Sequence, residues 1–360
     1  MRRPAGWTLL WSGIAAPGVS PRVWMLLLSA LVVMSAAATW RVRAVVAGHT
    51  VEAAAPPPLL ATPIPAAQPV AGTQELRIAG SSAVWSAPAL PRTEVRRVAS
   101  RVVLPTLSSL PHTPSGEVDN WVVRLATGQR AEMQRYLERM ARYEPLIRFA
   151  LAERGLPGDL LYLALIESGF SPRAVSAAGA VGIWQFMPGT ARDQGLEVST
   201  YVDERRDPVR ATYAAVRHLE WLHRQFGSWH LATAAYNAGD SRVGGVLQQL
   251  TGSRGGQETL YWMIRPHLPT ETQDYVPKLL AASRIARSPE QYGFDRLAPA
   301  APLRFREVSV PGGVPLAAVA HAAGVAAEEV YELNPHLVQQ ITPPGRRWPV
   351  RIPAQPASGG

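Results

Sequence analysis

Cysteine is absent from the 360 residues, and lysine occurs once, at Lys278, although the formal net charge is +9. Without cysteine the chain has no disulfide, thiol nucleophile, zinc-thiolate site or lipidated Cys. This absence does not exclude an oxidising compartment. The 8 histidines form no group with metal-ligand spacing, so we expect no metal and no cofactor.

The positive charge is carried almost entirely by arginine, and it suits an acidic partner such as nucleic acid, anionic lipid or an anionic cell-surface polymer. No nucleic-acid motif occurs, and no arginine stripe alternates with aromatic residues, so we expect no nucleic-acid partner. The 33 prolines lie mostly outside the middle of the chain. One compact fold does not accommodate so many, and the ends are therefore expected to be linkers or small modules.

The N-terminal segment 1–43 carries a targeting signal. Its apolar run from Val23 to Trp40 is flanked by Arg22 and Arg41, and its length is about that of a minimal membrane span, roughly 17 to 20 residues. Small residues near the end of the run also suit signal-peptidase cleavage. We expect either a cleaved signal peptide or an uncleaved membrane signal-anchor, and the basic leader slightly favours the anchor. In both cases the rest of the chain is expected to be exported to the periplasm or cell envelope, anchored to the inner membrane in the second case.

Residues 44–116 are rich in proline and alanine, which predicts a disordered tether. From 117 to 292 apolar residues recur three and four positions apart, which predicts a mainly α-helical domain. Within it, Pro145 is expected to split a helical stretch. Asp159 is expected to cap a helix that ends at Gly169.

The C-terminal part predicts a small separate module. After a proline-bearing linker at 293–304, residues 305–353 show a strand pattern, two short helical patterns and a second strand pattern. That order is βααβ, and a tail at 354–360 follows it. The expected fold class is therefore mainly α with a small βααβ module.

Glu167 lies at the end of an almost wholly apolar segment, where a charged group is costly unless something uses it. The helix that starts near Asp159 would place it in the last turn, where the partial negative charge of the helix disfavours an anion. Both effects raise a carboxyl pKa, as a general acid for a glycosidic oxygen requires. A lone buried Glu is nevertheless more often structural, capping backbone or pairing with an arginine.

Two polar–aromatic loops after Glu167 change this balance. Gly179 and Gly182 permit tight turns and close approach of backbone to a ligand. Trp184 offers a flat apolar face for a sugar ring, and Gln185 offers both donors and an acceptor. Similar loop residues without a ligand would serve core packing and a helix C-cap. One acid with two such loops is typical of a glycosidase site.

Four motifs occur in a fixed order, at Ile166–Phe170, Gly182–Pro188, Ala235–Gly239 and Glu271–Pro277. Together with Asp203–Pro208 they resemble the successive motifs of family 1 lytic transglycosylases, whose soluble-transglycosylase (SLT) domain is lysozyme-like. The membrane-bound lytic transglycosylase D type is the most similar subgroup. The resemblance covers roughly residues 121 to 287, and it implies that 117–292 form a lysozyme-like helical domain.

This resemblance implies an enzyme that cleaves the β-1,4 bond between MurNAc and GlcNAc in peptidoglycan without water, leaving a 1,6-anhydro end. Glu167 would first protonate the leaving oxygen and then, as a base, take the proton of the muramyl C6 hydroxyl. Ordinary retaining and inverting glycosidases use two carboxylates. No second one is obvious near Glu167 in the sequence, although Asp193, Asp203 and Asp207 remain candidates.

The resemblance also implies a set of substrate-binding residues. They would hold the sugar N-acetyl group, line the central subsites, shape the second loop and close the site over Glu167. These residues are Ser176, Gln185, Met187, Tyr236, Asn237 and Tyr275.

The C-terminal module resembles a degenerate LysM domain, a βααβ unit that binds N-acetylglucosamine polymers. Leu333–Pro335 and the closing Val350–Pro353 carry this resemblance. Pro311–Pro315 stands where LysM domains usually have a different, sugar-contacting loop. Glycan binding by this module is therefore an open expectation, since fold does not imply function.

Two other functions stay open. A hydrolase of the goose-lysozyme type would need an acid placed to activate water, and a non-enzymatic scaffold would use both folds only to bind the cell wall. In each case the expected partners are peptidoglycan glycan strands, joined by the membrane if the N-terminal segment is not cleaved. We expect a monomer.

Overall fold

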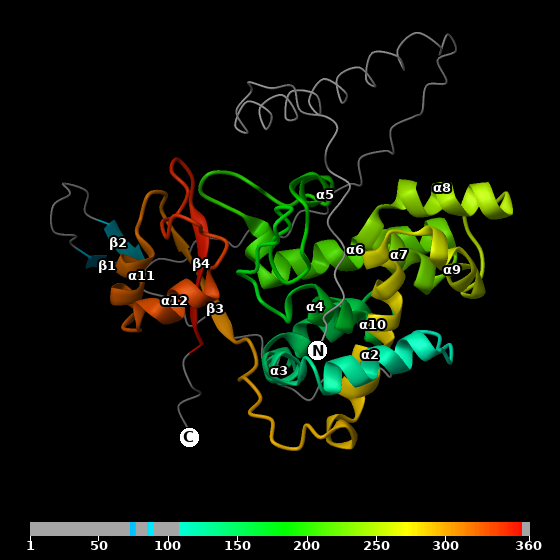
Figure 1. The fold of residues 1–360 in the computed structure, drawn as a ribbon. Helices are drawn as coiled ribbons and strands as arrows, with labels where there is room; N and C mark the ends of the chain where they lie inside the picture. The colour runs from blue at the N-terminus through cyan, green and yellow to red at the C-terminus, as the bar shows by residue number, and fades with distance from the viewer. Residues whose placement is uncertain (1–72, 77–84, 89–107, 355–360) are drawn as a thin grey trace, which may run out of the picture. The chain divides into compact units, whose positions relative to one another are not determined.

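The computed structural model describes residues 108–354 and, before them, the strands β1 (Thr73–Leu76) and β2 (Trp85–Pro88), as Figure 1 shows. These two strands pair in antiparallel fashion, with Thr73 opposite Pro88. The predicted signal segment 1–43, most of the predicted tether and nearly all of the predicted tail lie outside the described residues. No described helix is both long and apolar enough to cross a membrane.

Helices dominate the chain from residue 116 to residue 292, which confirms the predicted mainly α-helical class. The α-helices are α2 (Gly116–Ala126), α3 (Arg130–Ala152), α4 (Leu161–Ser168), α5 (Pro188–Asp193), α6 (Pro208–Phe226), α7 (Trp229–Ala238), α8 (Asp240–Thr251), α9 (Thr259–Ile264) and α10 (Thr270–Arg287). Three short 3₁₀ turns lie between these helices, at η1 (Gly158–Leu160), η2 (Glu204–Arg206) and η3 (Arg265–His267), and η4 (Pro289–Tyr292) follows α10.

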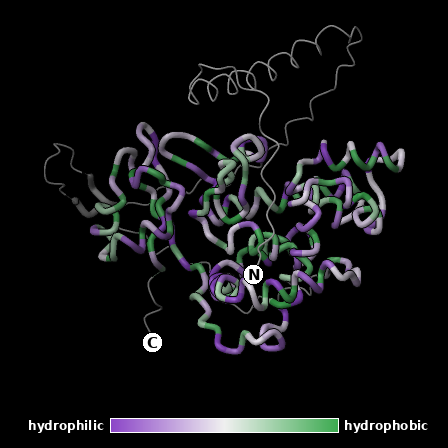
Figure 2. The backbone as a smooth tube through the Cα atoms, viewed as in Figure 1, coloured by the Kyte–Doolittle hydropathy of each residue, from purple (hydrophilic) through white to green (hydrophobic). Residues whose placement is uncertain are grey.

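Helix α4 lies at the centre of this helical body. It packs against α3 and α10, while α10 also packs against α2 and α7. Every residue of Leu161–Leu165 is buried, and Figure 2 shows the green of hydrophobic residues where α4 runs. A helix that is apolar on all sides belongs in a core. The last turn of α4 is thereby brought between the other helices.

Helix α3 runs unbroken through Pro145, so the predicted split is wrong. Proline removes one backbone donor and tends to break a helix. However, Leu137 before it and Ile147 after it are both buried in the same core. Tertiary packing thus holds the two parts of α3 together.

Asp159 does not cap α4, contrary to the prediction. It lies in η1, where its carboxylate accepts a hydrogen bond from the Leu110 backbone N at 2.9 Å and pairs with the Arg287 guanidinium. Leu110 is itself buried in the core. Residues 108–111, which the sequence placed in the tether, therefore pack on the helical body.

The C-terminal module has the predicted βααβ order. Its elements are β3 (Phe305–Val310), α11 (Leu316–Ala323), α12 (Ala327–Leu333) and β4 (Trp348–Pro353). Strands β3 and β4 pair in antiparallel fashion, with Val310 opposite Trp348. The module has a small hydrophobic core of its own, and Val202 from the helical body is part of it.

Candidate active site

Glu167 occupies the last turn of α4, as the sequence predicted. The helix ends at Gly169, whose φ of 56° is left-handed and whose N–H bonds back to the helix. A Cβ at Gly169 would lie 2.1 Å from the Tyr136 ring, so the position has both a conformational and a steric need for glycine. The end of α4, and with it the direction of Glu167, is set by this residue.

The Glu167 carboxyl faces helix α10 and contacts Tyr275 on it. The Tyr275 hydroxyl donates a hydrogen bond of 2.5 Å to its Oε1. Burial raises the pKa of Glu167 to about 7, while the Tyr275 hydrogen bond and the positive charge of Lys278 act against the rise and the charge of Glu271 adds to it. The carboxyl can therefore hold a proton near neutral pH, which a general acid requires.

Two tyrosines flank this carboxyl from different helices. Tyr236 on α7 donates a hydrogen bond of 2.8 Å to the Trp184 backbone carbonyl, and Tyr275 on α10 donates to Glu167. Burial and the charge of Glu167 raise the pKa of both phenols well above the usual value. Both hydroxyls therefore stay protonated and act as neutral donors that surround the acid without ionising.

The first loop after α4 is held in a strained shape. Gln185 has a positive φ of 49°, uncommon for a residue other than glycine. Its side-chain amide bonds back to the Gly182 carbonyl at 2.8 Å. Gly182 has a φ of 86°, and a Cβ there would lie 1.8 Å from the Arg205 carbonyl oxygen. The backbone of the loop thus packs directly against η2, with no room for a side chain at Gly182.

The other predicted residues of this loop have different surroundings. The Ser176 hydroxyl accepts a hydrogen bond of 3.0 Å from the Ala180 backbone N, closing a turn of the loop. Met187 is 44% exposed just before α5, as an apolar side chain available to a ligand would be. Ser168 ties the loop to α4 by donating to the Ile183 carbonyl at 2.9 Å. Loop and acid are therefore parts of one structure.

Asn237 connects α7 to α10. Its side-chain nitrogen donates to Glu271 Oε1 at 3.2 Å, and its side-chain oxygen accepts from the Thr272 hydroxyl at 2.8 Å. Because Tyr275 follows one turn later on α10, these contacts help to fix the phenol that bonds Glu167. The structure thus connects Asn237 with the acid through α10.

Two charged residues near the acid were not predicted from the sequence. Lys278 donates a hydrogen bond of 3.4 Å to the Ile166 carbonyl, and burial lowers the pKa of its ammonium group. Glu271 is the one described carboxylate whose charge acts on the pKa of Glu167. One signal was available, because Lys278 is the only lysine in the chain and follows Tyr275 by three residues, on the same helix face.

The three candidate second carboxylates have other partners. Asp203 pairs with Arg205 at 2.8 Å, and Asp207 pairs with Arg351 of the C-terminal module at 2.9 Å. The charge of Asp193 acts instead on His218, whose pKa is lowered mainly by burial. Within residues 108–354, then, none of the three faces Glu167 as a partner, and no group of three or more His, Asp and Glu side chains has the geometry of a metal site.

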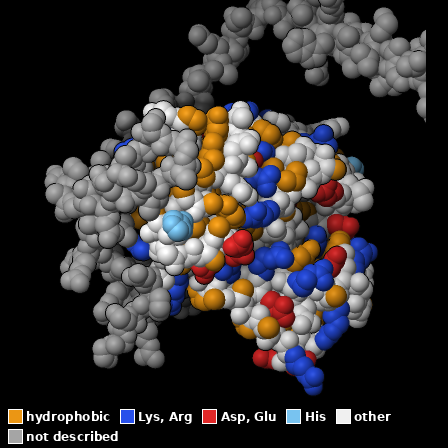
Figure 3. Space-filling model, turned by 90° about the vertical axis from the view of Figure 1, so that its left-hand side faces the viewer, with side chains coloured by type: hydrophobic (Ala, Val, Ile, Leu, Met, Phe, Trp, Pro, Cys, Tyr) orange, Lys and Arg blue, Asp and Glu red, His pale blue; other side chains and the backbone are white. Residues whose placement is uncertain are grey.

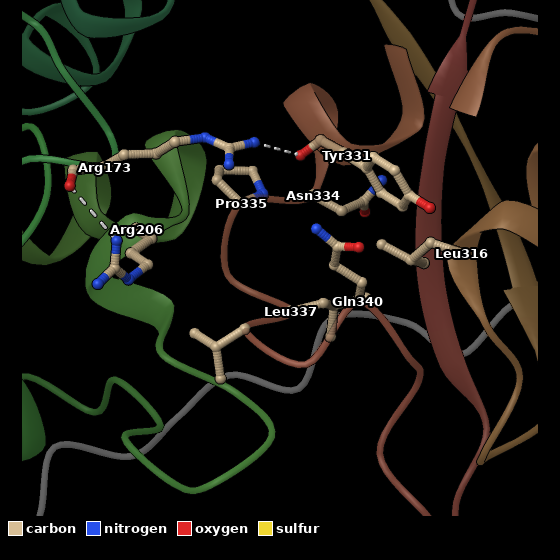
Figure 4. A pocket seen from close by; sticks show the side chains of 9 residues that line it. Arg173, Arg206, Leu316, Tyr331, Asn334, Pro335, Leu337 and Gln340 are labelled. Atoms are coloured by element: carbon tan, nitrogen blue, oxygen red, sulfur yellow. Dashed lines mark hydrogen bonds between the residues drawn. The ribbon is translucent and has the colours of Figure 1, made fainter. Parts of the chain in front are cut away.

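A distinct pocket of about 250 Å³ lies where the helical body meets the C-terminal module (Figure 4). Arg173 and Arg206 line it from the helical body, and Tyr331 and Gln340 are among the residues that line it from the module. Arg173 donates to the Tyr331 carbonyl at 3.0 Å. Glu167 does not line this pocket.

Comparison with known proteins identifies two domains. Residues 145–256 match the transglycosylase SLT domain, and residues 304–358 match the LysM-like domain of lytic transglycosylase MltD. The resemblance that the motifs predicted is therefore confirmed: the chain carries an SLT domain followed by an MltD-type LysM-like domain.

Individual relatives agree with these matches. The chain is 34% identical over 216 residues to membrane-bound lytic murein transglycosylase D of Escherichia coli K12, covering 57% of this chain and 47% of that protein. It is 31% identical over 124 residues to soluble lytic murein transglycosylase of the same strain, covering 33% of this chain and 19% of that protein. The chain thus spans just under half of the first relative and a smaller part of the second.

A solved structure of an inactive mutant of lytic transglycosylase Slt from Pseudomonas aeruginosa is also similar. It shares 28% identity, with 43% of this chain and 24% of that chain covered, and the TM-score is 0.34. This score is low, so the roles of individual residues rest on the contacts described above.

Proposed function

We propose that this protein is a lytic transglycosylase that cleaves the β-1,4 bond between MurNAc and GlcNAc of peptidoglycan and leaves a 1,6-anhydro-MurNAc end. The observation that carries the proposal is the Glu167 carboxyl, which is held by a neutral phenol and has a pKa raised to about 7 by burial. A carboxyl of this kind can give up a proton and take one back at the same pH.

In the proposed reaction one carboxyl acts twice. Protonated Glu167 gives its proton to the glycosidic oxygen as the bond from C1 to that oxygen breaks, and the GlcNAc leaves as an alcohol. The carbonyl oxygen of the muramyl N-acetyl group stabilises C1 meanwhile, a recognised substitute for a second carboxylate. Ionised Glu167 then takes the proton of the C6 hydroxyl, and O6 bonds to C1 as the N-acetyl oxygen leaves. Water is not consumed.

The surrounding residues support these steps in our proposal. Tyr275 holds the carboxyl in place through its hydrogen bond. Tyr236 holds the first loop beside the acid through the Trp184 carbonyl, and Asn237 joins the second loop to α10. Ser176, Gln185 and Met187 shape and line the sugar subsites. Lys278 favours the ionised form of Glu167 after the first proton transfer, because its positive charge lowers the pKa of that carboxyl.

The test compares the wild type with Glu167→Gln on purified peptidoglycan sacculi. Analysis of the released fragments should show anhydro ends with the wild type and almost none with the variant. Glu328→Gln, on the exposed side of α12, is the matched control and should behave as the wild type. If Glu167→Gln releases as much anhydro product as the wild type, Glu167 is not the acid.

A hydrolase is the second candidate, because the charge of Glu271 acts on Glu167. An inverting enzyme would need this second carboxylate as a base that activates water. In our proposal Glu271 serves instead to hold Asn237 by its 3.2 Å hydrogen bond. Glu271→Gln should therefore still give anhydro ends, whereas a hydrolase would lose its activity and would give reducing ends in the wild type.

We also propose that the protein acts in the cell envelope as a monomer on glycan strands. The name of its Escherichia coli relative, a membrane-bound murein enzyme, supports this location. The charge of the chain agrees with it, because the formal net charge is +9, and Figure 3 shows Lys and Arg side chains on one face with Asp and Glu interspersed among them. A basic surface would raise the local concentration of an acidic wall polymer.

A further inference from the structure

The LysM-like module and the SLT domain share a strand-like contact. Val202 pairs with Leu337 as an antiparallel bridge. Next to it the Asp203 backbone N donates to the His336 carbonyl at 2.9 Å, and the Val338 backbone N donates to the Tyr201 carbonyl at 3.1 Å. Because Val202 is fully buried within the core of the module, residues 201–203 belong to both domains.

A buried ion pair lies beside this contact. Arg351, 6% exposed, donates from Nη1 to Asp207 Oδ1 at 2.9 Å, and Asp207 is 2% exposed. The same carboxylate oxygen caps α6 by accepting from the Val209 and Arg210 backbone nitrogens. Burial, the largest single influence, raises the pKa of Asp207, but the lowering effects of the groups around it, with the Arg351 charge foremost, together exceed it, and the net shift is downward.

His336 completes this buried group without being charged. Its Nδ1 lies 3.6 Å from Asp207 Oδ2. Burial lowers the pKa of His336 to about 4, so near neutral pH the ring is uncharged and Arg351 is the cation that balances Asp207. Removal of Arg351 would therefore leave a buried carboxylate without its cation, which is strongly destabilising.

The segment that the module holds is also the one that supports the site loop. Asp203 binds the Arg205 guanidinium through two hydrogen bonds, of 2.8 and 2.9 Å. Arg205 in turn donates to the Gly179 carbonyl at 3.0 Å and to the Phe186 carbonyl at 3.2 Å. These carbonyls lie on either side of Gln185 and of the Gly182 position that presses on Arg205.

We propose that the LysM-like module is a positioning part of the catalytic site, acting on the loop 179–186 through residues 201–207. Arg351 and the His336 backbone hold that segment, and Arg205 passes the constraint to the loop that carries Gln185. The inference rests on the proposed function in one respect, namely that this loop binds the glycan. The pocket in Figure 4 agrees with this proposal, because residues of the module and Arg173 and Arg206 of the SLT domain line it together.

The interface offers a matched pair of variants in the full-length chain. Arg351→Gln removes the buried pair. Arg346→Gln removes another contact between module and SLT domain, the 2.5 Å pair with Glu197, in which the Arg346 side chain is 49% exposed. Exposed pairs contribute little to stability. Both substitutions are Arg→Gln at a contact between the two domains and they differ in burial, so the second is the control for the first. Arg351→Gln also removes the 3.2 Å pair with Glu307 inside the module.

The first measurement needs no enzymatic activity. Amide hydrogen exchange in residues 179–187 should become at least about tenfold faster in Arg351→Gln and stay unchanged in Arg346→Gln, because local opening follows the loss of buried contacts. Unchanged exchange in Arg351→Gln would overturn the proposal, whatever reaction the protein catalyses. Lack of any product from the wild type would count against the proposed function alone.

The second measurement is kinetic and uses both short soluble glycan fragments and whole sacculi. For Arg351→Gln we expect kcat/KM to fall by about 100-fold on both, the effect of a displacement near 1 Å in a site, with a raised KM on the short fragments. A variant that only unfolds part of the molecules would lower kcat and leave KM unchanged. A loss on sacculi with normal turnover of short fragments would show that the module is only a wall tether, and would overturn the proposal.

Arg205→Lys covers the case in which Arg351→Gln fails to fold. Lysine keeps the positive charge beside Asp203 but lacks the planar fork that reaches both the carboxylate and the two loop carbonyls. It should raise KM on short fragments and speed exchange in residues 179–187, while the module remains folded. Wild-type values for both would contradict the proposed connection.

Discussion

Glu167 is half-buried and Asp207 is buried, and the pKa values of these two carboxyl groups shift in opposite directions. Burial works to raise the pKa of each. At Glu167 the contacting donor is the neutral Tyr275, and the pKa rises to about 7. At Asp207 the contacting donor is the Arg351 guanidinium, and the pKa falls below its usual range. A neutral donor thus leaves the rise caused by burial in place, whereas a charged donor helps to reverse it.

This difference matches the proposed roles. A carboxyl that must give up a proton and take it back cannot have a guanidinium in contact, because the ion pair would keep it ionised. A carboxylate that caps a helix and joins two domains needs to stay ionised at every working pH. The donor in contact with each carboxyl is therefore suited to the role proposed for it.

The largest effect is expected from removing the proposed proton donor. Glu167→Gln keeps the shape and the Tyr275 hydrogen bond but cannot transfer a proton, so kcat should fall by about 10³-fold, within the range for general acid–base catalysis. The rate of release of anhydro fragments from sacculi measures it. A fall of less than tenfold would mean that another group supplies the proton.

The second effect is on stability at the structural carboxylate. Asp207→Ala leaves the buried Arg351 with only the half-exposed Glu307 as a partner and removes the cap of α6. It should lower the free energy of unfolding by about 3 kcal/mol. Asp207→Asn keeps an oxygen for the cap and should cost less. Denaturant unfolding measures both, with Arg346→Gln, expected to cost at most about 1 kcal/mol, as the control. An equal loss of unfolding free energy at the Asp207–Arg351 and Glu197–Arg346 pairs would contradict the expected difference between a buried and an exposed ion pair.

The third effect is a gain in stability, in contrast to the loss expected at Asp207. The pKa of Glu167 is about 7 in the fold against 4.5 in the unfolded chain, so the native state binds this proton more tightly. Stability is therefore lost as pH rises from 4.5 through 7, by at most about 3 kcal/mol. Glu167→Gln, which cannot ionise, should be more stable than the wild type near pH 8, and this advantage should be absent near pH 4. A pH-independent difference between the two would show that the Glu167 pKa is not raised.

The smallest effect concerns the phenol that tunes the acid. The Tyr275 hydrogen bond lowers the pKa of Glu167 against the larger effect of burial. Tyr275→Phe should therefore raise that pKa and move the alkaline fall of kcat/KM to higher pH. The pH profile on soluble glycan checks the direction, and a shift to lower pH would contradict the assignment of this donor.

Much of the site could be predicted from the sequence because its residues stand in local motifs. Glu167 at a glycine-terminated helix end and Gln185 in a glycine-bearing loop both follow from short-range pattern. Tyr275 on α10 was predicted only through the family resemblance, and Lys278 and Glu271 of the same helix were missed, because α10 meets α4 only in the folded chain. Their positions relative to Glu167 depend on how the helices pack, and spacing along the chain does not reveal that packing.

The contact between the two domains could not be predicted from the sequence. Asp207 is separated from Arg351 by 144 positions, and nothing in either local sequence indicates a partner. Asp159 shows the same limit, because a local pattern typical of a helix cap was overridden by Leu110 and Arg287, which are distant in sequence. Short polar side chains satisfy whichever partner the tertiary fold brings, and for that reason they were predicted least well.

The most direct test of the central claim, that Glu167 works as acid and base without water, is cleavage in water enriched in heavy oxygen. Mass spectrometry of the released muropeptides should show 1,6-anhydro ends that carry no heavy oxygen, because O6 of the same sugar takes the place of water at C1. Heavy oxygen at a reducing C1 in the main product would contradict the account and would identify a hydrolase that uses a second carboxylate, with Glu271 as the first to examine.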